Sequence, residues 1–543
     1  MTAQTFPASK IPGRRKLYLD ALYDSDRTGR FFSWPHPTTA AFEACARHLD
    51  SVGSDRTAVT QLLVEQNEHF AAPVEAIKAA QELVLPGAVA AFTGQQAGLF
   101  GGPLYTIYKA LTLLGWAGRL RESLGRPVVP VFWIAADDHD FDEVRWTAFP
   151  DLENKVRRLL VSIDGLADRT PLAQIVLKDS VWELLAEMRS AQLETEFSNS
   201  VFDALRDDYA PGRSMVDAFG RWLARLLGPF GLVMFNPADP AAKRLWKPLF
   251  AEEISGYAET AAALSEINQR LTEAGYHQQV EHPEQHTHLF YLQQGRHALK
   301  TASDGHLLID PDPAPQSRVK WLRQLEADPS SFSPGVLFRP VAQSYLFPVI
   351  AAVCGPSEIA YWAQSRALFD RFEVLMPVVL PRSSATIVEG KNRNAVEALG
   401  HEVPEFFGDV ECVINRYFER SFPSDLERQF KESREDWDRR LEQLKAEVVS
   451  FEPTLAMTFE QSAGRIAMAW ENLEKKVFQA HKRKGDEIRG KFYKLATHLY
   501  PDGKPQERVF GIPYYLNKFG FEFLLRVREQ LKIGTPDHQI IEP

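Results

Sequence analysis

The chain is 543 residues long, with 45% hydrophobic and 25% charged residues, which is ordinary for a soluble globular protein of several domains. Its net charge of −10 at pH 7 argues against broad binding of nucleic acids or anionic membranes, because both need a basic surface. Residues 1–16 lack an apolar core of signal-peptide length, no apolar run reaches the roughly 18 residues of a membrane span, and the three cysteines are widely spaced, so we expect a cytoplasmic protein without disulfides.

Residues 1–143 are predicted to hold an N-terminal arm and the first half of an α/β core. Four prolines before residue 38 favour an extended arm, and apolar residues at helical spacing over 38–83 favour helices. A strand begins at residue 88, where an apolar run without charge suits a parallel sheet buried on both faces. Residues 93–96 break this run, and a helix is expected over 103–121.

The loop between this strand and this helix is a candidate binding site. It holds Gly98, Gly101 and Gly102; glycine lets the backbone approach a ligand closely, and free N–H groups at a helix start attract anions. The same glycines could simply form a tight turn. Two adjacent glutamines and polar residues in the first helical turns favour a site. The substrate-binding candidates here are Gln95, Gln96, Gly98, Tyr105, Thr106 and Lys109. The loop matches neither GxGxxG nor GxxxxGK[ST], which argues against a standard dinucleotide or Walker site.

A second buried strand is predicted over 126–135, and an acidic cluster follows it. Five carboxylates and one histidine lie within residues 137–143. Unpaired, they would repel one another, so a cation or hydrogen-bond donors should lie near. The catalytic candidates are Asp138, His139 and Asp140, with His139 as a general base. The alternatives are binding of a substrate amine, a metal held by these three residues, or a solvated helix N-terminus. We expect no metal, because the run has no diagnostic spacing.

Residues 144–337 interrupt the core. The segments predicted are a first insertion over 144–230 with a helix at 181–206, a core strand over 231–240, and a second insertion over 241–337. Alternating apolar and polar residues over 276–310 indicate a small antiparallel subdomain in the second insertion. Its five histidines, between positions 277 and 297, match no zinc-finger spacing, so we expect them to be exposed strand residues.

The second half of the core is predicted over 338–414. An apolar strand over 345–354 runs into a helix start, and we expect Cys354 at its end to be a core residue. Gly355, Glu358 and Tyr361 are further substrate-binding candidates; the last two lie one helical turn apart and could share a face toward the sheet edge. A fifth strand over 374–380 ends in Arg382 and neighbouring hydroxyl groups. They could bind an anion such as phosphate or cap a following helix.

The composition changes to charge-rich helix over 415–499. Apolar residues there step by four and three, the heptad spacing of a helical hairpin or a coiled-coil arm. The segment 500–543 is expected to dock on the core, although its Gln506 and Arg508 could also contact a nucleotide. If the apolar strands are parallel neighbours, the polar turns after them converge on one edge and form one cleft.

These segments together resemble the bacillithiol-biosynthesis cysteine-adding enzymes, the BshC family. The motifs that carry the resemblance occur in family order over nearly the whole chain, at 93–99, 102–106, 130–135, 138–141, 355–362, 376–382 and 506–508. The resemblance implies a Rossmann-like parallel-sheet core related to nucleotidylyl transferases, inserted connecting subdomains, and a C-terminal coiled coil that forms a homodimer. It also implies a ligase that joins L-cysteine to glucosaminyl-malate.

The resemblance further implies a nucleotide, ATP or ADP, near the end of the fifth strand and the C-terminal segment. On that basis the cofactor-binding candidates are Arg382, Ser384, Ala385, Thr386, Gln506, Glu507 and Arg508. Activation by a nucleotide is chemically reasonable, because amide formation from a free carboxylate and an amine is unfavourable in water. The sugar amine must lose a proton before it attacks, and His139 or Asp138 is the candidate base.

Two other functions fit the same sequence. The chain could be another nucleotidylyl transferase or amide-forming ligase, since a fold does not fix a substrate. It could also be a non-catalytic coiled-coil scaffold. The polar turns at the ends of successive strands favour an enzyme over a scaffold.

Overall fold

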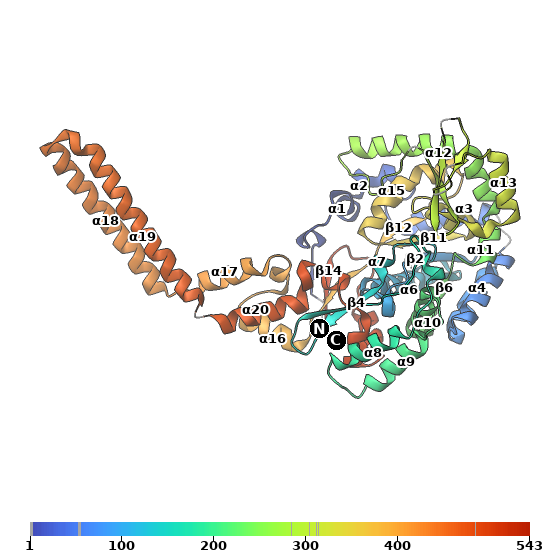
Figure 1. The fold of residues 1–543 in the computed structure, drawn as a ribbon, viewed down its shortest axis with the longest axis horizontal. Coiled ribbons are helices and arrows are strands. Elements are labelled where there is room, and N and C mark those ends of the chain that lie inside the picture. Colours follow the sequence, from blue (N-terminus) through green and yellow to red (C-terminus); the bar gives the residue numbers. More distant parts are fainter. Residues whose placement is uncertain are drawn as a thin grey trace. The chain divides into compact units, whose positions relative to one another are not determined.

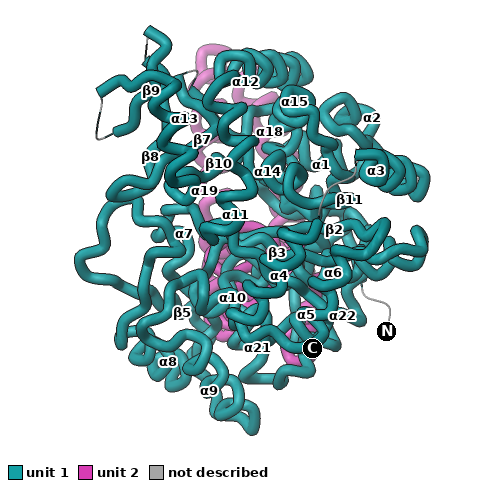
Figure 2. The backbone as a smooth tube through the Cα atoms, turned by 90° about the vertical axis from the view of Figure 1, so that its right-hand side faces the viewer, with its two compact units in different colours: residues 1–389, 504–543 teal, residues 390–503 magenta. Residues whose placement is uncertain are grey.

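The computed structural model describes residues 4–52, 56–283, 285–302, 304–310, 312, 314–483 and 485–543. The chain divides into two compact units (Figures 1 and 2). Unit 1 comprises residues 1–389 and 504–543, and unit 2 comprises residues 390–503. No helix in the described ranges is long and apolar enough to cross a bilayer.

A five-stranded sheet lies at the centre of unit 1. Its order is β12 (Val378–Pro381), β11 (Val349–Cys354), β2 (Val89–Gln95), β3 (Val128–Ile134) and β6 (Val233–Phe235), and all neighbours are parallel. The chain builds outward from β2 through β3 to β6, then returns to the other side of β2 for β11 and β12. This is the Rossmann strand order, with its switch point between β2 and β11. The α/β class and Rossmann-like core expected from sequence are confirmed.

Successive residues of the central strands enter opposite hydrophobic cores. Val89 and Ala91 of β2 pack into the core on one face, and Ala90 and Phe92 pack into the core on the other. All seven residues of β3 are buried. Apolar residues are therefore needed at every position, because helices cover both faces of the sheet.

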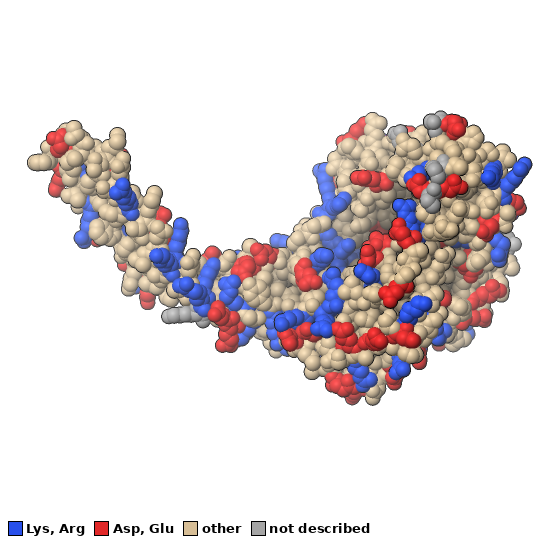
Figure 3. All heavy atoms as spheres, viewed as in Figure 1, with Lys and Arg blue, Asp and Glu red and all other residues tan. Residues whose placement is uncertain are grey.

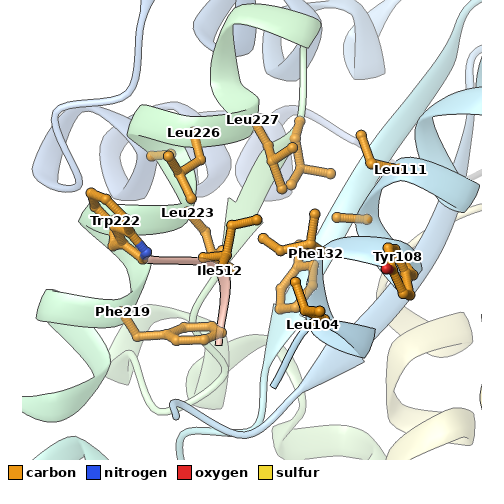
Figure 4. Close-up of a cluster of buried hydrophobic side chains, with 14 of the residues drawn as sticks. Leu104, Tyr108, Leu111, Phe132, Phe219, Trp222, Leu223, Leu226, Leu227 and Ile512 are labelled. Carbon is orange, nitrogen blue, oxygen red and sulfur yellow. The ribbon is translucent and has the colours of Figure 1, made fainter. Parts of the chain in front are cut away.

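The first face is covered mainly by α6 (Tyr105–Leu124) and α10 (Met215–Leu227). Figure 4 shows leucines of both helices meeting around Phe132 of β3, with Ile512 in the middle of the cluster and Trp222 at its edge. The second face is covered by α4 (Thr57–His69), α12 (Lys247–Glu273), α14 (Arg339–Leu346) and α15 (Pro356–Arg371). The two layers hold the sheet rigid and leave its carboxyl edge for the loops.

Three predicted boundaries are wrong, for identifiable reasons. β2 continues to Gln95, because Thr93 to Gln95 pair with β3 although they are polar. The fourth strand begins at Val349, since Pro348 separates it from α14, which contains Tyr345. The residues after β12 form a further strand, β13 (Ser384–Ile387), rather than a turn before a helix. Strand β13 pairs in parallel with β14 (His538–Ile541), which pairs with β1 (Thr5–Phe6).

The two interruptions of the core have different structures. The first contains the hairpin β4 (Trp146–Pro150) and β5 (Val156–Leu160), and two helices, α8 (Ser180–Ser190) and α9 (Ser198–Asp208), where one helix was predicted. The second contains the antiparallel sheet β10 (Phe332–Pro334), β7 (His286–Leu292), β8 (Arg296–Thr301) and β9 (Leu307–Leu308). The antiparallel subdomain predicted from alternation is confirmed.

The sequence predicted that the histidines of this subdomain are exposed, but two of them are buried. His288 is 2% exposed, and its Nδ1 lies 3.0 Å from Glu253 Oε1 of α12. His297 is also buried. The prediction failed because β7 packs against α12, and nothing in the alternation of β7 shows which of its faces that helix covers.

The remaining helices of unit 1 lie in the N-terminal arm, between core strands and near the C-terminus (Figure 1). They are α1 (Lys16–Tyr23), α2 (Ser25–Thr28), α3 (Thr39–Val52), α5 (Val74–Gln81), α7 (Phe141–Val144), α11 (Pro240–Leu245), α13 (Arg318–Ala327), α21 (Ile512–Phe519) and α22 (Phe523–Gln530).

Unit 2 is helical. Its helices are α16 (Gly390–Ala398), α17 (Val410–Arg420), α18 (Ser424–Phe451), α19 (Ala456–Arg483) and α20 (Asp486–Leu499). Helices α18 and α19 run side by side as a hairpin, turned by a short 3₁₀ segment at Pro453 (Figure 1). Proline cannot continue a helix, so it ends the first arm of the hairpin. The coiled coil predicted from heptad spacing is confirmed.

Candidate active site at the switch point of the sheet

A cavity of about 340 Å³ opens at the carboxyl ends of β2, β3 and β11. Ligands bind at this position in open α/β sheets, because the loops on either side of the switch point diverge. The parallel order β12-β11-β2-β3 brings four polar turns, far apart in sequence, to this edge. The volume suits a small molecule.

The cavity collects most of the predicted substrate-binding residues and part of the cofactor set. Predicted residues that line it are Gln95, Gln96, Tyr105, Lys109, Asp138, Gly355, Glu358, Tyr361, Arg382 and Arg508. Predicted residues outside its lining are Gly98, Thr106, His139, Asp140, Ser384, Ala385, Thr386, Gln506 and Glu507. The division separates side chains that can meet a ligand from those that hold the site in shape.

Lys109 and Glu358 form an ion pair across the switch point. Lys109 Nζ lies 2.6 Å from Glu358 Oε2 and also donates to the carbonyl of Gly94 and to Gln95 Oε1, at 2.7 and 2.9 Å. The same Glu358 oxygen accepts the N–H of Gly355 at 2.6 Å, which caps helix α15. The pair therefore fixes two cavity walls to each other.

Asp138 is held by arginines that the sequence did not identify. Arg339 donates to Asp138 Oδ1 at 2.5 Å, and Arg296 lies 3.5 Å from the same oxygen. Burial opposes ionisation of Asp138, but Arg339 and Arg296 outweigh it and lower the pKa of the carboxyl group. Asp138 is thus a fixed carboxylate and a weak base.

The acidic cluster was predicted to need nearby cations, and the structure supplies them from remote parts of the chain. Arg339 begins α14, 201 positions after Asp138, and Arg296 begins β8. The neighbouring Asp137 pairs with Lys243 at 2.7 Å, and both side chains are buried. The unbalanced negative charge of residues 137–143 indicated that cationic partners exist, but it did not indicate where in the chain they lie.

The other two catalytic candidates lie beside the cavity. His139 packs with its ring centroid 6.5 Å from that of Phe290, and its Nδ1 is buried without a hydrogen-bond partner among the described residues. Burial and Arg296 lower the pKa of His139. Asp140 is the N-cap of α7 and accepts the N–H of Glu143 at 3.3 Å. Its position is that of an ordinary helix cap.

Glu143, the last carboxylate of the cluster, lines the cavity, although it was not singled out from sequence. Loss of hydration raises the pKa of its carboxyl group, and Asp140 and Asp138 raise it further against the effect of Gln96 and Arg508. Nothing in the sequence distinguishes it from its four acidic neighbours, because the distinction depends on which way the turn after β3 faces.

Tyr105 lies among three cationic side chains. Its ring centroid is 6.0 Å from Lys109 Nζ, 5.6 Å from Arg382 Cζ and 5.9 Å from Arg508 Cζ. The first two cations are paired with carboxylates, whereas no carboxylate lies within ion-pair distance of Arg508 in the described part of the chain. Arg508 is exposed and lines the cavity, so it is available to an anionic ligand.

Arg382 forms a buried ion pair with Glu507. Its guanidinium donates to both Glu507 oxygens, at 2.9 and 2.7 Å, and both side chains are buried. Burial opposes ionisation of Glu507, but Arg382 and Arg14 hold its pKa far below the ordinary range. Glu507 also accepts hydrogen bonds from the Ser384 hydroxyl group at 2.9 Å and from the N–H of Ala385 at 3.3 Å.

The other predicted cofactor residues are bonded within the protein. Thr386 Oγ1 lies 2.9 Å from His538 Nε2. Gln506 accepts the N–H of Ile387 at 2.8 Å and donates to the Ile387 carbonyl at 2.9 Å. These contacts join β13 to the C-terminal segment and position Arg382 and Arg508.

The glycine-rich loop is fixed by packing. Tyr209, fully buried, accepts the N–H of Gly101 at 2.9 Å and donates to the carbonyl of Gly98 at 3.2 Å. A Cβ on Gly98 would lie 2.7 Å from the Cα of Gly102. Thr106 is buried, and its Oγ1 has no hydrogen-bond partner among the described residues. The loop thus fixes the backbone next to Gln95 and Gln96, which line the cavity.

One side of the cavity is apolar. Trp133, Trp362 and Phe92 line it together with Cys354, whose thiol pKa is raised well above its usual value by burial. A thiol held protonated is a poor nucleophile, in agreement with its expected place in the core. Among the described residues, no three His, Cys, Asp or Glu side chains are placed to hold a metal ion.

The cavity carries both signs of charge. Its cationic residues are Lys109, Arg339, Arg382 and Arg508, and its carboxylates are Asp138, Glu143 and Glu358. Figure 3 shows the same mixture on the molecular surface, where acidic and basic side chains are interspersed around a hollow in the larger body. Such a lining suits ligands that carry both an amine and carboxylate or phosphate groups.

Two family models together match almost the whole chain. The model described as "Bacillithiol biosynthesis BshC, N-terminal Rossmann-like domain" matches residues 1–383. The model of the family's C-terminal coiled-coil domain matches residues 385–543. The chain belongs to the BshC family. The boundary between the two matches falls six residues before the start of unit 2 at Gly390, within the strand β13.

Curated relatives of the BshC family align with the chain from end to end. A protein of Salinibacter ruber is 33% identical, with 99% of this chain and 98% of the relative aligned. A protein of Solibacter usitatus is 30% identical, with 98% of each aligned, and one of Koribacter versatilis is 28% identical over all of both chains. Each of these relatives is named "Putative cysteine ligase BshC".

Proposed function

We propose that this BshC-family protein is a ligase that forms an amide bond between the carboxyl group of L-cysteine and the amine of glucosaminyl-malate. ATP would activate the cysteine carboxyl group. The family relationship supports the choice of cysteine as a substrate. The structure supports it independently through the cavity at the switch point.

The single observation that carries the proposal is the two-signed lining of this cavity. Cysteine brings one ammonium and one carboxylate, and glucosaminyl-malate brings an amine and two carboxylates. Glu143 matches an ammonium group and Arg508 a carboxylate, because both line the cavity without an ion-pair partner in the described ranges, while Glu358 and Arg339 line it as members of internal ion pairs. Trp133 and Trp362 form an apolar wall that would shield the reacting groups from water and so strengthen electrostatic contacts there.

The nucleotide would lie on the side of Tyr105 and Arg508. We propose that Arg508 contacts its phosphates, because this cation has no carboxylate partner in the described ranges and lines the cavity. Arg382 and Glu507 would act mainly by positioning this wall, since each already satisfies the other. Ser384, Ala385 and Thr386 of β13 would support the same wall, together with Gln506, which is hydrogen-bonded to Ile387 of that strand.

We also propose that the protein is a homodimer through the hairpin of unit 2. Helices α18 and α19 carry exposed apolar side chains, among them Trp437, Ile466 and Leu473, at 47%, 43% and 47% exposure. These three residues line one apolar groove on the hairpin. Exposed patches of this kind on soluble proteins usually mark association surfaces.

The reaction is tested by incubating the purified protein with cysteine, glucosaminyl-malate and ATP, and following bacillithiol by mass spectrometry. Product that depends on all three components supports the proposal. Omission of ATP separates nucleotide-dependent from direct condensation. If no product forms, exchange of pyrophosphate into ATP with each amino acid in turn identifies another ligase of the same fold, and an absence of any exchange rejects amino-acid adenylation.

A further inference from the structure

The proposed reaction requires a group that takes a proton from the attacking amine. An ammonium has no lone pair, so the sugar nitrogen must be deprotonated before it attacks the activated carboxyl group of cysteine. Asp138 is neutralised by Arg339 and Arg296, at 2.5 and 3.5 Å. His139 lies outside the cavity lining and packs on Phe290. Neither of these two residues presents a free basic atom to the cavity.

Glu143 meets the geometric requirement. It lines the cavity from the last turn of α7, directly after the end of β3 at the switch-point edge. In the described part of the chain it has no ion-pair partner, whereas its neighbour Asp142 pairs with Arg145 at 2.8 Å. Gln96 hydrogen-bonds to its carboxylate, but no cation neutralises it, so it can still accept a proton.

The groups around Glu143 come from three elements. Asp138 and Asp140 lie on the turn that precedes α7, Gln96 follows β2, and Arg508 ends the 3₁₀ segment Gln506–Arg508. The two aspartates and the loss of hydration raise the pKa of Glu143, and Gln96 and Arg508 oppose them. The residue is exposed, and the net effect of these groups is a raised pKa, which makes the carboxylate a stronger base than a glutamate without such neighbours.

We infer that Glu143 is the general base of the ligase reaction, which rests on the function proposed above. One Glu143 oxygen takes a proton from the amine of glucosaminyl-malate, so that an N–H bond breaks and an O–H bond forms. The freed nitrogen lone pair then attacks the cysteine carboxyl carbon activated by the nucleoside triphosphate. The C–N bond forms as the bond to the phosphate-bearing leaving group breaks. The nitrogen then loses its second proton, which the released phosphate oxygen takes up, and the proton on Glu143 passes to solvent at the cavity mouth.

The test compares Glu143→Gln with Glu143→Asp and with Asp142→Asn. The glutamine keeps the shape of Glu143 and removes its basic oxygen, and the aspartate keeps the carboxylate. Asp142→Asn removes one negative charge from the same short helix at a position outside the cavity lining. We measure kcat and KM for glucosaminyl-malate from pH 4.5 to 9, together with the thermal unfolding midpoint of each variant.

We expect Glu143→Gln to lower kcat by a factor of about 100 or more, the usual contribution of a general base, with KM changed much less. The wild-type rate should rise with pH through an acidic limb that Glu143→Gln removes. Glu143→Asp should keep that limb and part of the rate, and Asp142→Asn should match the wild type. A rescue of Glu143→Gln by added small carboxylates such as formate would support the same role.

The inference is overturned if Glu143→Gln retains the wild-type kcat and acidic limb, or if His139→Ala removes the limb instead. If Glu143→Gln unfolds at lower temperature, Glu143→Asp decides. As the base, the aspartate should shift the midpoint of the acidic limb to lower pH because its pKa is lower, whereas a merely structural role would leave that midpoint unchanged. A wild-type protein without turnover would count against the proposed ligase, whereas an active wild type with an active Glu143→Gln counts only against the base.

Discussion

Lys109 Nζ lies 2.6 Å from Glu358 Oε2, and this ion pair joins the helix after β2 to the helix after β11. These two strands flank the switch point of the sheet. The lysine side chain is 4% exposed and the glutamate 23% exposed, so the pair is largely shielded from solvent. It sets the separation of the two walls between which a ligand would bind.

Glu358→Gln should lower the free energy of unfolding by about 3 kcal/mol, because it leaves the buried Lys109 ammonium without its counter-charge. Urea unfolding measures this change. The matched control is Glu326→Gln, which breaks the exposed pair with Lys247 at 2.8 Å and should cost less than about 1 kcal/mol. Equal losses in the two variants would show that the pair at the switch point contributes no more than a surface contact.

Gly98→Ala should destabilise the protein by about 1–3 kcal/mol, because its Cβ would meet the backbone of Gly102 and the loop would have to move. The loop carries Gln95 and Gln96 into the cavity, so KM for cysteine should rise as well. Gly118→Ala is the control in helix α6, where a Cβ meets nothing within 4 Å. That change should raise stability by roughly 0.5–1 kcal/mol, as measured by denaturant unfolding.

Glu507 should make stability depend on acidity. Arg382 and Arg14 hold its pKa in the folded state below the ordinary 4.5, so its ion pairing stabilises the fold above about pH 4.5 and is lost as the pH falls toward the lowered pKa. Glu507→Gln should cost about 3–5 kcal/mol at pH 7, and the difference from the wild type should shrink below pH 4.5. Unfolding midpoints across pH 3–7 provide the measurement; a constant difference would assign the loss to packing.

Arg508→Gln should raise KM for the anionic cosubstrate by about 10- to 100-fold, the range expected for one hydrogen bond to a charged group. Its unfolding free energy should be unchanged, since the side chain is exposed and without a carboxylate partner in the described ranges. Lys504→Gln removes a positive charge from an exposed position nearby in sequence that does not line the cavity. A KM effect of equal size in Lys504→Gln would indicate general charge attraction instead of a contact. Separate titrations of ATP and glucosaminyl-malate identify which anion is bound.

The double variant Ile466→Lys with Leu473→Lys should convert a dimer to a monomer, because two charges would enter the apolar groove of the α18–α19 hairpin. Light scattering coupled to size exclusion measures the mass. The control is Lys475→Glu, an exposed charge change on the same helix at a position that does not line the groove. A wild-type protein that is monomeric at micromolar concentration would contradict the proposed homodimer directly.

The central sheet could be predicted from sequence because its strands are long, apolar and uncharged, as in Val128 to Ile134. Strand β13 could not, since its four residues, Ser384 to Ile387, gain their partners from β14 near the C-terminus. Pairing over such a separation leaves no local pattern. The polar end of β2 was missed for the same reason: register with β3, and not the character of its residues, extends it.

The sequence allowed us to predict which turns form the candidate site, but not the chemical role of each side chain in it. Each turn follows an apolar strand, so parallel order alone brings Gln95, Asp138 and Glu358 to one edge. The roles depend on partners that come from elsewhere, such as Arg339 beside Asp138. Asp138 forms ion pairs with two arginines, whereas Glu143 has no ion-pair partner in the described ranges. Residues five positions apart therefore acquire opposite chemical characters.

Arg296 has a consequence for how such a protein can be altered. It begins β8 of the antiparallel subdomain, donates to Ser333 at 3.0 Å and to the Pro334 carbonyl at 2.9 Å, and reaches Asp138 at the end of β3. The subdomain is thus not a detachable module. A chimera that exchanges it between relatives must carry a guanidinium at this position, or the Asp138 carboxylate in the cavity lining loses part of its charge compensation. Sequence drift in the subdomain is therefore coupled to the acidic turn of the core.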